Sequence, residues 1–269
     1  MIPAQENYCV SDLDSYSRSK DVEETTTMPI RRLGKPSSPT ALRLLCLPPA
    51  GAGASIYYPL MALDSPSIEI CPISLPGRED RFREPLPASI HELAQQLARD
   101  LAPELDRSYA ILGYSMGAIL GFEMIQLWRN WGCLQPQTLI ALAARPPQVR
   151  FALGIHDLSD EAFRNTLLEM GGTPAEVLSN DEAMEIYSPI IRCDFRNCDN
   201  YQYQPQAPID CPIQGFVSDC DPLVSVDHAQ QWQECTNANF TLELLKNEPH
   251  IIPHETLKAV VQKALAHRP

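Results

Sequence analysis

The serine at position 115 is the residue of this sequence best placed to do chemistry. Residues 113–117 read Gly-Tyr-Ser-Met-Gly, after an apolar run at 109–112 and before a helical pattern at 118–131. A strand, a sharp turn and a helix in this order form a nucleophile elbow, in which strained backbone presents the serine hydroxyl. Because G-x-S-x-G also arises by chance in turns, the assignment depends on the partners that the rest of the chain provides.

A serine nucleophile needs a base to take its proton and an acid to orient that base. Asp221 follows an expected strand at 211–217, and His250 follows the last expected strand, at 240–245. The chain order Ser, Asp, His is that of the α/β-hydrolases. We therefore expect Ser115, Asp221 and His250 to form a catalytic triad.

Other residues compete for the roles of acid and base. Asp219 is the alternative acid, in the same loop as Asp221. His254 is the alternative base, but we expect it to begin the final helix, and we expect His228 at the surface of the helix after the acid loop. Each of these residues could equally be an ordinary turn or surface residue.

An oxyanion hole needs two backbone N–H groups, one from the residue after the nucleophile and one from the loop after the first strand. The first is Met116. The loop at 48–54 reads Pro-Pro-Ala-Gly-Ala-Gly-Ala, and its small side chains would let Ala50 approach a tetrahedral intermediate. A phosphate-binding loop is excluded, because neither a P-loop Lys-Ser/Thr pair nor G-x-G-x-x-G is present.

Strands alternate with amphipathic helices along most of the chain, which predicts an α/β fold with a mostly parallel sheet covered on both faces. A capping box at Ser89 and Glu92 opens one of the helices. The expected strands lie at 42–47, 68–73, 109–112, 138–142, 211–217 and 240–245, and the expected helices at 90–101, 118–131, 225–234 and 256–267.

The alternation stops between residues 144 and 200, where the pattern is helical only. The expected helices cover 157–170, 174–178 and 181–197, with a break near Pro189. Because ligands bind at the carboxyl edge of such a sheet, we expect residues 151–188 to be a lid over the site. The alternative is a set of packing helices with no gating role.

The length of 269 residues suits one domain, which we place at 39–269. Residues 1–38 include a stretch rich in Ser, Asp, Glu and Thr, and we expect a mobile extension there. Neither a signal peptide nor an apolar run of about 18 residues is evident, so we expect a cytoplasmic protein with no membrane segment.

Net charge and cysteine spacing argue against further classes of binding site. A net charge of −13 argues against binding to nucleic acid or to anionic membranes. The nine cysteines are scattered and form no C-x-x-C pair, which indicates reduced thiols and no zinc site. We expect neither a metal nor a cofactor.

Several blocks of sequence resemble the type II thioesterases that accompany nonribosomal peptide and polyketide synthases. The blocks are Leu-Pro-Pro-Ala-Gly-Ala at 47–52, Leu-Pro-Gly-Arg-Glu-Asp-Arg at 75–81, Glu-Pro at 84–85, the elbow at 113–118, Pro-Ile-Ile-Arg-Cys-Asp-Phe-Arg at 189–196, Cys-Pro-Ile at 211–213 and Asp-Pro at 221–222. The resemblance runs from about residue 44 to 257. The block at 75–81 is far more specific than G-x-S-x-G.

The resemblance implies an α/β-hydrolase fold with a helical lid, and it supports Ser115, Asp221 and His250 as the triad with Ala50 and Met116 as oxyanion donors. It implies hydrolysis of an acyl thioester on the phosphopantetheine arm of an acyl or peptidyl carrier protein, which removes stalled groups from the synthase. The sequence departs from the family pattern at Tyr114, where the family usually has histidine. We expect the enzyme to be a monomer.

Arg78, Arg81 and Arg83 form a cluster that we expect near the site. They could dock an acidic carrier protein, or they could make internal ion pairs with Glu79, Asp80 and Glu84; both interpretations stay open at this point.

Two other functions are open as well. One is a medium-chain fatty acyl thioesterase or carboxylesterase. The other is a non-catalytic binding module on a hydrolase scaffold, against which an intact triad argues.

Overall fold

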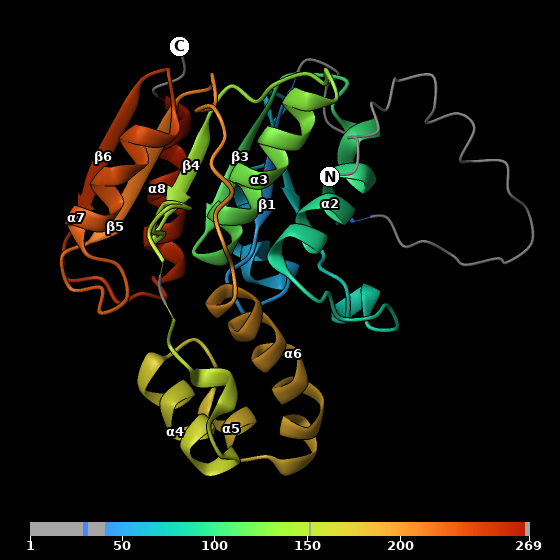
Figure 1. The fold of residues 1–269 in the computed structure, drawn as a ribbon, viewed down its shortest axis with the longest axis vertical. Helices are drawn as coiled ribbons and strands as arrows, with labels where there is room; N and C mark the ends of the chain where they lie inside the picture. Colours follow the sequence, from blue (N-terminus) through green and yellow to red (C-terminus); the bar gives the residue numbers. More distant parts are fainter. Residues whose placement is uncertain (1–28, 32–40, 151, 267–269) are drawn as a thin grey trace, which may run out of the picture.

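A six-stranded parallel sheet forms the centre of the protein (Figure 1). The structure is a computed structural model and describes residues 29–31, 41–150 and 152–266. The strand order is β2-β1-β3-β4-β5-β6, and every neighbouring pair is parallel. The strands are β1 (Leu42–Leu47), β2 (Ile68–Pro72), β3 (Tyr109–Tyr114), β4 (Leu139–Leu142), β5 (Ile213–Ser218) and β6 (Phe240–Leu245). The predicted α/β class and all six predicted strands are confirmed.

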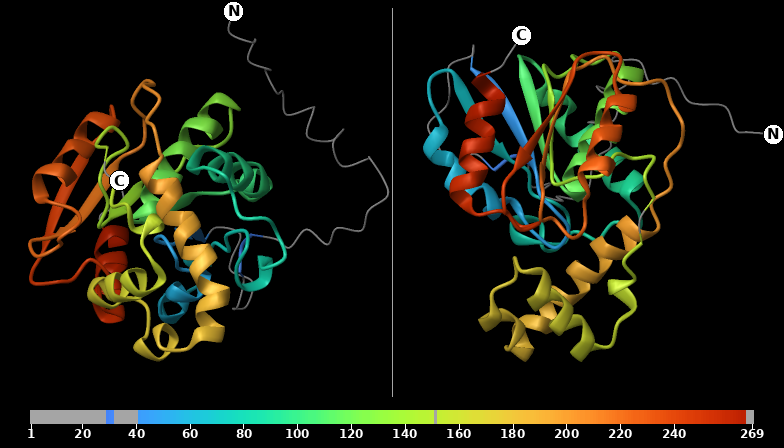
Figure 2. Two further views of the ribbon diagram at one scale, coloured as in Figure 1. Left: turned by 60° about the horizontal axis from the view of Figure 1, so that its bottom comes forward. Right: turned by 90° about the vertical axis from the view of Figure 1, so that its left-hand side faces the viewer.

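Helices cover both faces of this sheet, as the buried parallel strands require. Helices α2 (Ile90–Leu101) and α3 (Met116–Asn130) pack on one face, and the 3-10 helix η2 (Ala54–Leu63) and α8 (His254–Ala266) pack on the other (Figure 2). The short helix α7 (Val226–Gln230) follows β5.

The strand β1 shows why both faces are apolar. Leu45 and Leu47 belong to the core under α2 and α3, whereas Leu44 and Cys46 belong to the core under η2 and α8. Successive side chains of a strand point to opposite faces, so a continuous apolar run fills two layers at once.

The predicted capping box begins helix α2. Ser89 Oγ accepts from the backbone N–H of Glu92 at 3.1 Å, and the Glu92 carboxylate accepts from the backbone N–H of Ala88 at 2.7 Å. These two bonds satisfy N–H groups that have no partner inside the helix.

The helical segment between β4 and β5 lies beyond the carboxyl ends of the strands (Figure 1). It consists of η5 (Ile155–Asp157), α4 (Asp160–Met170), α5 (Ala175–Leu178) and α6 (Asp181–Asp199). Its helices enclose an apolar cluster of their own, formed by Ile155, Phe163, Leu167, Leu178, Met184, Ile191 and Phe195.

The predicted break near Pro189 is wrong, because α6 continues through it from Asp181 to Asp199. Proline removes one helical hydrogen bond and costs about 3 kcal/mol in a helix interior. The residues that follow directly, Ile190 and Ile191, are buried, and Ile191 belongs to the apolar cluster of the helical segment.

The expected mobile extension at 1–38 lies largely outside the described residues. Within it, residues 29–31 run beside the end of β2. Ile30 forms a bridge with Ile73, the N–H of Arg31 donates to the carbonyl of Pro72 at 2.9 Å, and the N–H of Ser74 donates to the carbonyl of Pro29 at 2.8 Å. Among the described residues, no helix has the length and apolar character needed to cross a membrane.

Candidate active site

Ser115 lies at a strained turn between β3 and α3. Its backbone has φ 51° and ψ −114°, and its N–H donates to the carbonyl of Leu142 on β4 at 2.9 Å. A Cβ at Gly113 would lie 2.3 Å from Ala118 Cα, and a Cβ at Gly117 would lie 2.1 Å from the carbonyl oxygen of Leu47. Glycine is therefore required on both sides of the serine, as a nucleophile elbow demands.

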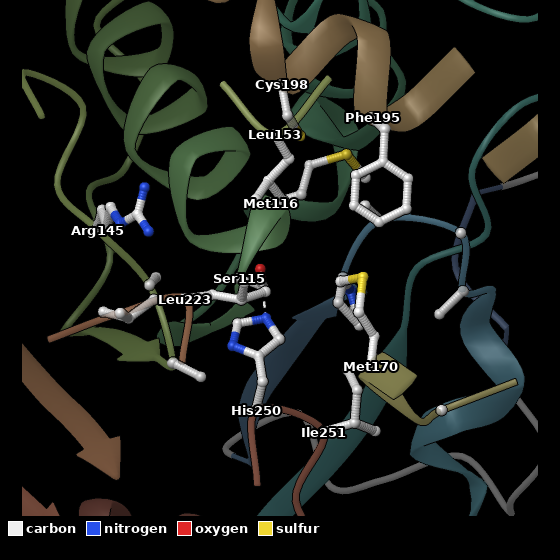
Figure 3. Close-up of a pocket in the computed structure, with 18 of the residues that line it drawn as sticks. Ser115, Met116, Arg145, Leu153, Met170, Phe195, Cys198, Leu223, His250 and Ile251 are labelled. Atoms are coloured by element: carbon white, nitrogen blue, oxygen red, sulfur yellow. Dashed lines mark hydrogen bonds between the residues drawn. The ribbon is translucent and has the colours of Figure 1, made fainter. Parts of the chain in front are cut away.

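A chain of hydrogen bonds joins the serine to a histidine and an aspartate. His250 Nε2 lies 3.1 Å from Ser115 Oγ (Figure 3), and His250 Nδ1 lies 2.8 Å from Asp221 Oδ2. An ionised carboxylate can only accept hydrogen bonds, so Nδ1 carries the proton and Nε2 is left to accept from the serine hydroxyl. This is the tautomer in which a histidine can act as the base for a serine.

The loop after β5 fixes the Asp221 side chain, which is fully buried. Asp221 Oδ1 accepts from the backbone N–H groups of Leu223 at 2.8 Å and Val224 at 3.1 Å. These bonds occupy one oxygen and turn the other towards His250. The acid is thus oriented by its own loop before any substrate binds.

The alternative candidates for the acid and the base lie outside this chain of hydrogen bonds. Asp219 accepts from the backbone N–H of Asn247 at 2.8 Å and pairs with Lys246 at 3.2 Å. The Asn247 N–H and the Lys246 ammonium hold the pKa of Asp219 below its usual value. His254 is the first residue of α8, as predicted, and His228 lies on α7. Of the candidate acids and bases, the structure thus brings Asp221 and His250 together with Ser115.

Ala50 and Met116 lie with Ser115 in the wall of one cavity. Met116 is the first residue of α3. Ala50 lies in a turn closed by a hydrogen bond of 3.2 Å from the N–H of Ala52 to the carbonyl of Pro49, with φ +77° at Gly51. A positive φ at the third position is what a type II turn requires.

Comparison with known proteins shows to which family this chain belongs. The family model described as "Thioesterase domain" matches residues 42–264. The chain belongs to the thioesterase family.

Individual relatives agree with the family. The thioesterase is 35% identical over 207 residues to the gramicidin S biosynthesis protein GrsT of Aneurinibacillus migulanus, covering 77% of this chain and 81% of the relative. It is 30% identical over 214 residues to the thioesterase PikA5 of Streptomyces venezuelae, covering 79% and 76%. The solved structure of BorB, the type II thioesterase of the borrelidin biosynthetic cluster, superposes with a TM-score of 0.79 at 33% identity, covering 89% and 97%.

The cavity of the thioesterase, about 200 Å³ in volume, lies between the elbow and the helical segment. Much of its wall is apolar, from the body of the protein and from α4 and α6 (Figure 3): Met116, Ile119, Val149, Leu153, Leu167, Met170, Ile191, Phe195 and Ile251. An apolar chain attached to a carbonyl at Ser115 would be removed from water here, which favours binding.

Docking, one of the two interpretations left open for these arginines, does not fit Arg78 and Arg81, whose side chains are only 4% and 1% exposed. Arg78 forms an ion pair with Asp194, and Arg81 pairs with Glu84 and Asp100. Buried and paired guanidinium groups cannot reach a partner protein. Of the internal ion pairs that the sequence suggested, Arg81 with Glu84 is present. Glu79 and Asp80 pair with Arg31 instead, and the other partners are Asp194 for Arg78 and Asp100 for Arg81.

Arg83 is exposed and stays a candidate for contact with a partner. Within residues 29–31, 41–150 and 152–266, no group of three or more His, Cys, Asp or Glu side chains could hold a metal ion.

Sequence reasoning missed the functions of two residues at this site. Tyr114 binds the loop that carries His250, and Asp194 binds the loop that carries Ala50. Asp194 is only 1% exposed, and a buried carboxylate needs a partner. Its burial and its pairing with Arg78 follow from the fold, and the sequence carries no signal for either.

Proposed function

We propose that this thioesterase hydrolyses acyl groups carried as thioesters on the phosphopantetheine arm of a carrier protein. One observation carries the proposal: the hydrogen-bonded chain Asp221–His250–Ser115 at the edge of an apolar cavity. The chain supplies a nucleophile with its base and acid, and the cavity offers a site for an acyl group.

In the first half of the reaction, Ser115 Oγ attacks the thioester carbonyl while His250 Nε2 takes its proton. The negative charge moves to the carbonyl oxygen, where the N–H groups of Ala50 and Met116 stabilise it. The carbon–sulfur bond then breaks, the imidazolium returns its proton to the departing sulfur, and an acyl-serine ester remains. Asp221 stabilises the imidazolium during this step.

In the second half, a water molecule gives a proton to His250 and attacks the acyl-serine. The ester oxygen of Ser115 leaves with the proton from His250, and the free acid is released. A thiolate is a better leaving group than an alkoxide, so we propose that hydrolysis of the acyl-serine is the slow step.

The relatives support a role in assembly-line biosynthesis. GrsT is named for gramicidin S biosynthesis, and BorB is a type II thioesterase from a biosynthetic cluster. We propose that this thioesterase likewise clears stalled or misprimed acyl groups from a nonribosomal peptide or polyketide synthase. The helical segment from η5 to α6 would act as a lid over the acyl group, since α4 and α6 provide part of the cavity wall.

Hydrolysis of the same acyl group from three substrates, a carrier protein thioester, a coenzyme A thioester and an oxygen ester, tests this proposal. We expect the largest kcat/KM for the acyl-carrier protein, a smaller one for acyl-coenzyme A and the smallest for an oxygen ester, with Ser115→Ala inactive on all three. Preference for acyl-coenzyme A would favour a fatty acyl thioesterase, and preference for oxygen esters a carboxylesterase. Failure of a fluorophosphonate to label Ser115 would indicate a non-catalytic module.

A further inference from the structure

A buried ion pair holds the loop that follows β1. Asp194 of α6 accepts two hydrogen bonds from Arg78, at 2.6 Å and 2.9 Å, in a bidentate pair. Both side chains are nearly inaccessible to solvent. Removing two charges from water is costly, so a pair of this kind persists where both groups are well hydrogen-bonded.

The remaining hydrogen bonds of this pair go to the backbone of the turn that contains Ala50. Asp194 Oδ2 accepts from the N–H of Gly51 at 2.8 Å, and an Arg78 Nη1–H donates to the carbonyl of Ala52 at 3.0 Å. The peptide directly after Ala50 is therefore held at its N–H, and the end of the turn is held at its carbonyl.

We propose that Asp194, oriented by Arg78, is a positioning residue for the oxyanion hole. By fixing the Ala50–Gly51 peptide, it sets the direction of the Ala50 N–H, and this inference rests on the proposed function of Ala50 as an oxyanion donor. Misplacement of a catalytic group by about 1 Å can cost on the order of 10²-fold in rate. Because Asp194 belongs to α6, the same contact connects the turn to a helix that begins in the lid.

A neighbouring ion pair provides a matched control. Arg81 is as buried as Arg78 and pairs with Asp100 at 2.9 Å, but its backbone contact is to the carbonyl of Ser74. Neither Arg81 nor Asp100 contacts the turn at 49–52 in these hydrogen bonds. Asp100→Asn likewise weakens an ion pair of a buried arginine, although Asp100 is 21% exposed and Arg81 also pairs with Glu84, whereas Asp194 is 1% exposed. Of the two variants, only Asp194→Asn touches the oxyanion loop.

The test is the rate at which a fluorophosphonate labels Ser115, measured on folded protein checked by circular dichroism. The phosphoryl oxygen enters the oxyanion hole, so this rate reports the hole without any thioester. We expect Asp194→Asn to label at least about tenfold more slowly than wild type and Asp100→Asn to stay within about threefold. Arg78→Lys, which keeps the charge beside Asp194, should slow labelling in the same direction and replaces Asp194→Asn if that variant does not fold.

Equal slowing by Asp100→Asn, or wild-type labelling in Asp194→Asn and Arg78→Lys, would overturn the positioning role. The two proposals fail separately. A wild type that is labelled rapidly but hydrolyses no acyl-carrier protein contradicts the proposed substrate, while slow labelling of Asp194→Asn still supports the positioning of Ala50.

Discussion

Tyr114 donates a hydrogen bond from its hydroxyl to the backbone carbonyl of His250 at 2.7 Å. The same oxygen accepts from the backbone N–H of Ile252 at 2.7 Å. Burial raises the pKa of Tyr114 well above its usual value, so the hydroxyl keeps the proton that it donates. The residue directly before the nucleophile therefore holds the loop that carries the base.

Tyr114→Phe should weaken both stability and catalysis. It leaves a buried carbonyl and a buried N–H without their partner, which costs about 1–3 kcal/mol of unfolding free energy. Loosening of His250 should also lower kcat by at least about tenfold, since a catalytic base must stay within hydrogen-bond reach. Urea unfolding and steady-state kinetics measure the two effects.

The control for this variant is Tyr109→Phe. Tyr109 lies on the same strand as Tyr114, and its hydroxyl donates to the carbonyl of Leu134 at 2.7 Å instead of to the His250 loop. It should lose stability and keep its kcat. An equal fall in kcat in both variants would mean that Tyr114 only stabilises the fold.

A comparison of Asp221→Asn with Asp219→Asn should show which of the two aspartates in this loop is the catalytic acid. Loss of the carboxylate removes the group that fixes the His250 tautomer, and the comparable change in another serine hydrolase lowers kcat about 10⁴-fold. Asp219→Asn removes a surface ion pair and should change kcat by less than about threefold. A larger loss in Asp219→Asn than in Asp221→Asn would contradict the assignment.

Met170→Trp should shorten the acyl groups that the enzyme accepts. Met170 lines the cavity at the end of α4, and a larger side chain there would occupy space needed by an extended chain. We expect kcat/KM for an octanoyl thioester to fall by at least about tenfold relative to an acetyl thioester, because overpacking costs about 1–3 kcal/mol.

Leu168→Trp is the control for the cavity, because Leu168 lies on the same helix and is 56% exposed. Its ratio of octanoyl to acetyl hydrolysis should match the wild type. If Leu168→Trp shifts the ratio as much as Met170→Trp, the cavity does not hold the acyl chain.

Stability should fall at alkaline pH because of buried thiols. Burial raises the pKa of Cys211 and of Cys235 to about 12. An unfolded thiol ionises near 8.5, so above that pH the folded state holds more protons than the unfolded state. The contribution of each buried thiol to the free energy of unfolding is therefore fully present below about pH 8.5 and is lost as the pH rises. The loss is about 2 kcal/mol per thiol between about pH 8 and pH 10.

Urea unfolding across this pH range measures the loss. Cys211→Ala should unfold at lower urea concentration at every pH, but its stability should depend less steeply on pH than that of the wild type. The same pH dependence in both proteins would show that Cys211 does not contribute to it.

Local patterns predicted the elements and the triad because the required signals are short. The capping box at Ser89 and the turn at Ser115 are each encoded within about five residues, and alternation of strands and helices then places Asp221 and His250 at one edge of the sheet. The long-range partners could not be predicted. Arg78 is buried because Asp194 lies opposite it, and nothing near Arg78 in the sequence distinguishes it from the exposed Arg83.

The most direct test of the mechanism is the identity of the residue that carries the acyl group during turnover. Acyl-carrier protein is mixed with the enzyme, quenched in acid within the first turnover and digested for mass spectrometry. If Ser115 is the nucleophile, the peptide that contains it gains the mass of the acyl group, and Ser115→Ala gains none and does not turn over. An acyl adduct on another residue such as the exposed Cys220, or turnover by Ser115→Ala at the wild-type rate, would contradict that role.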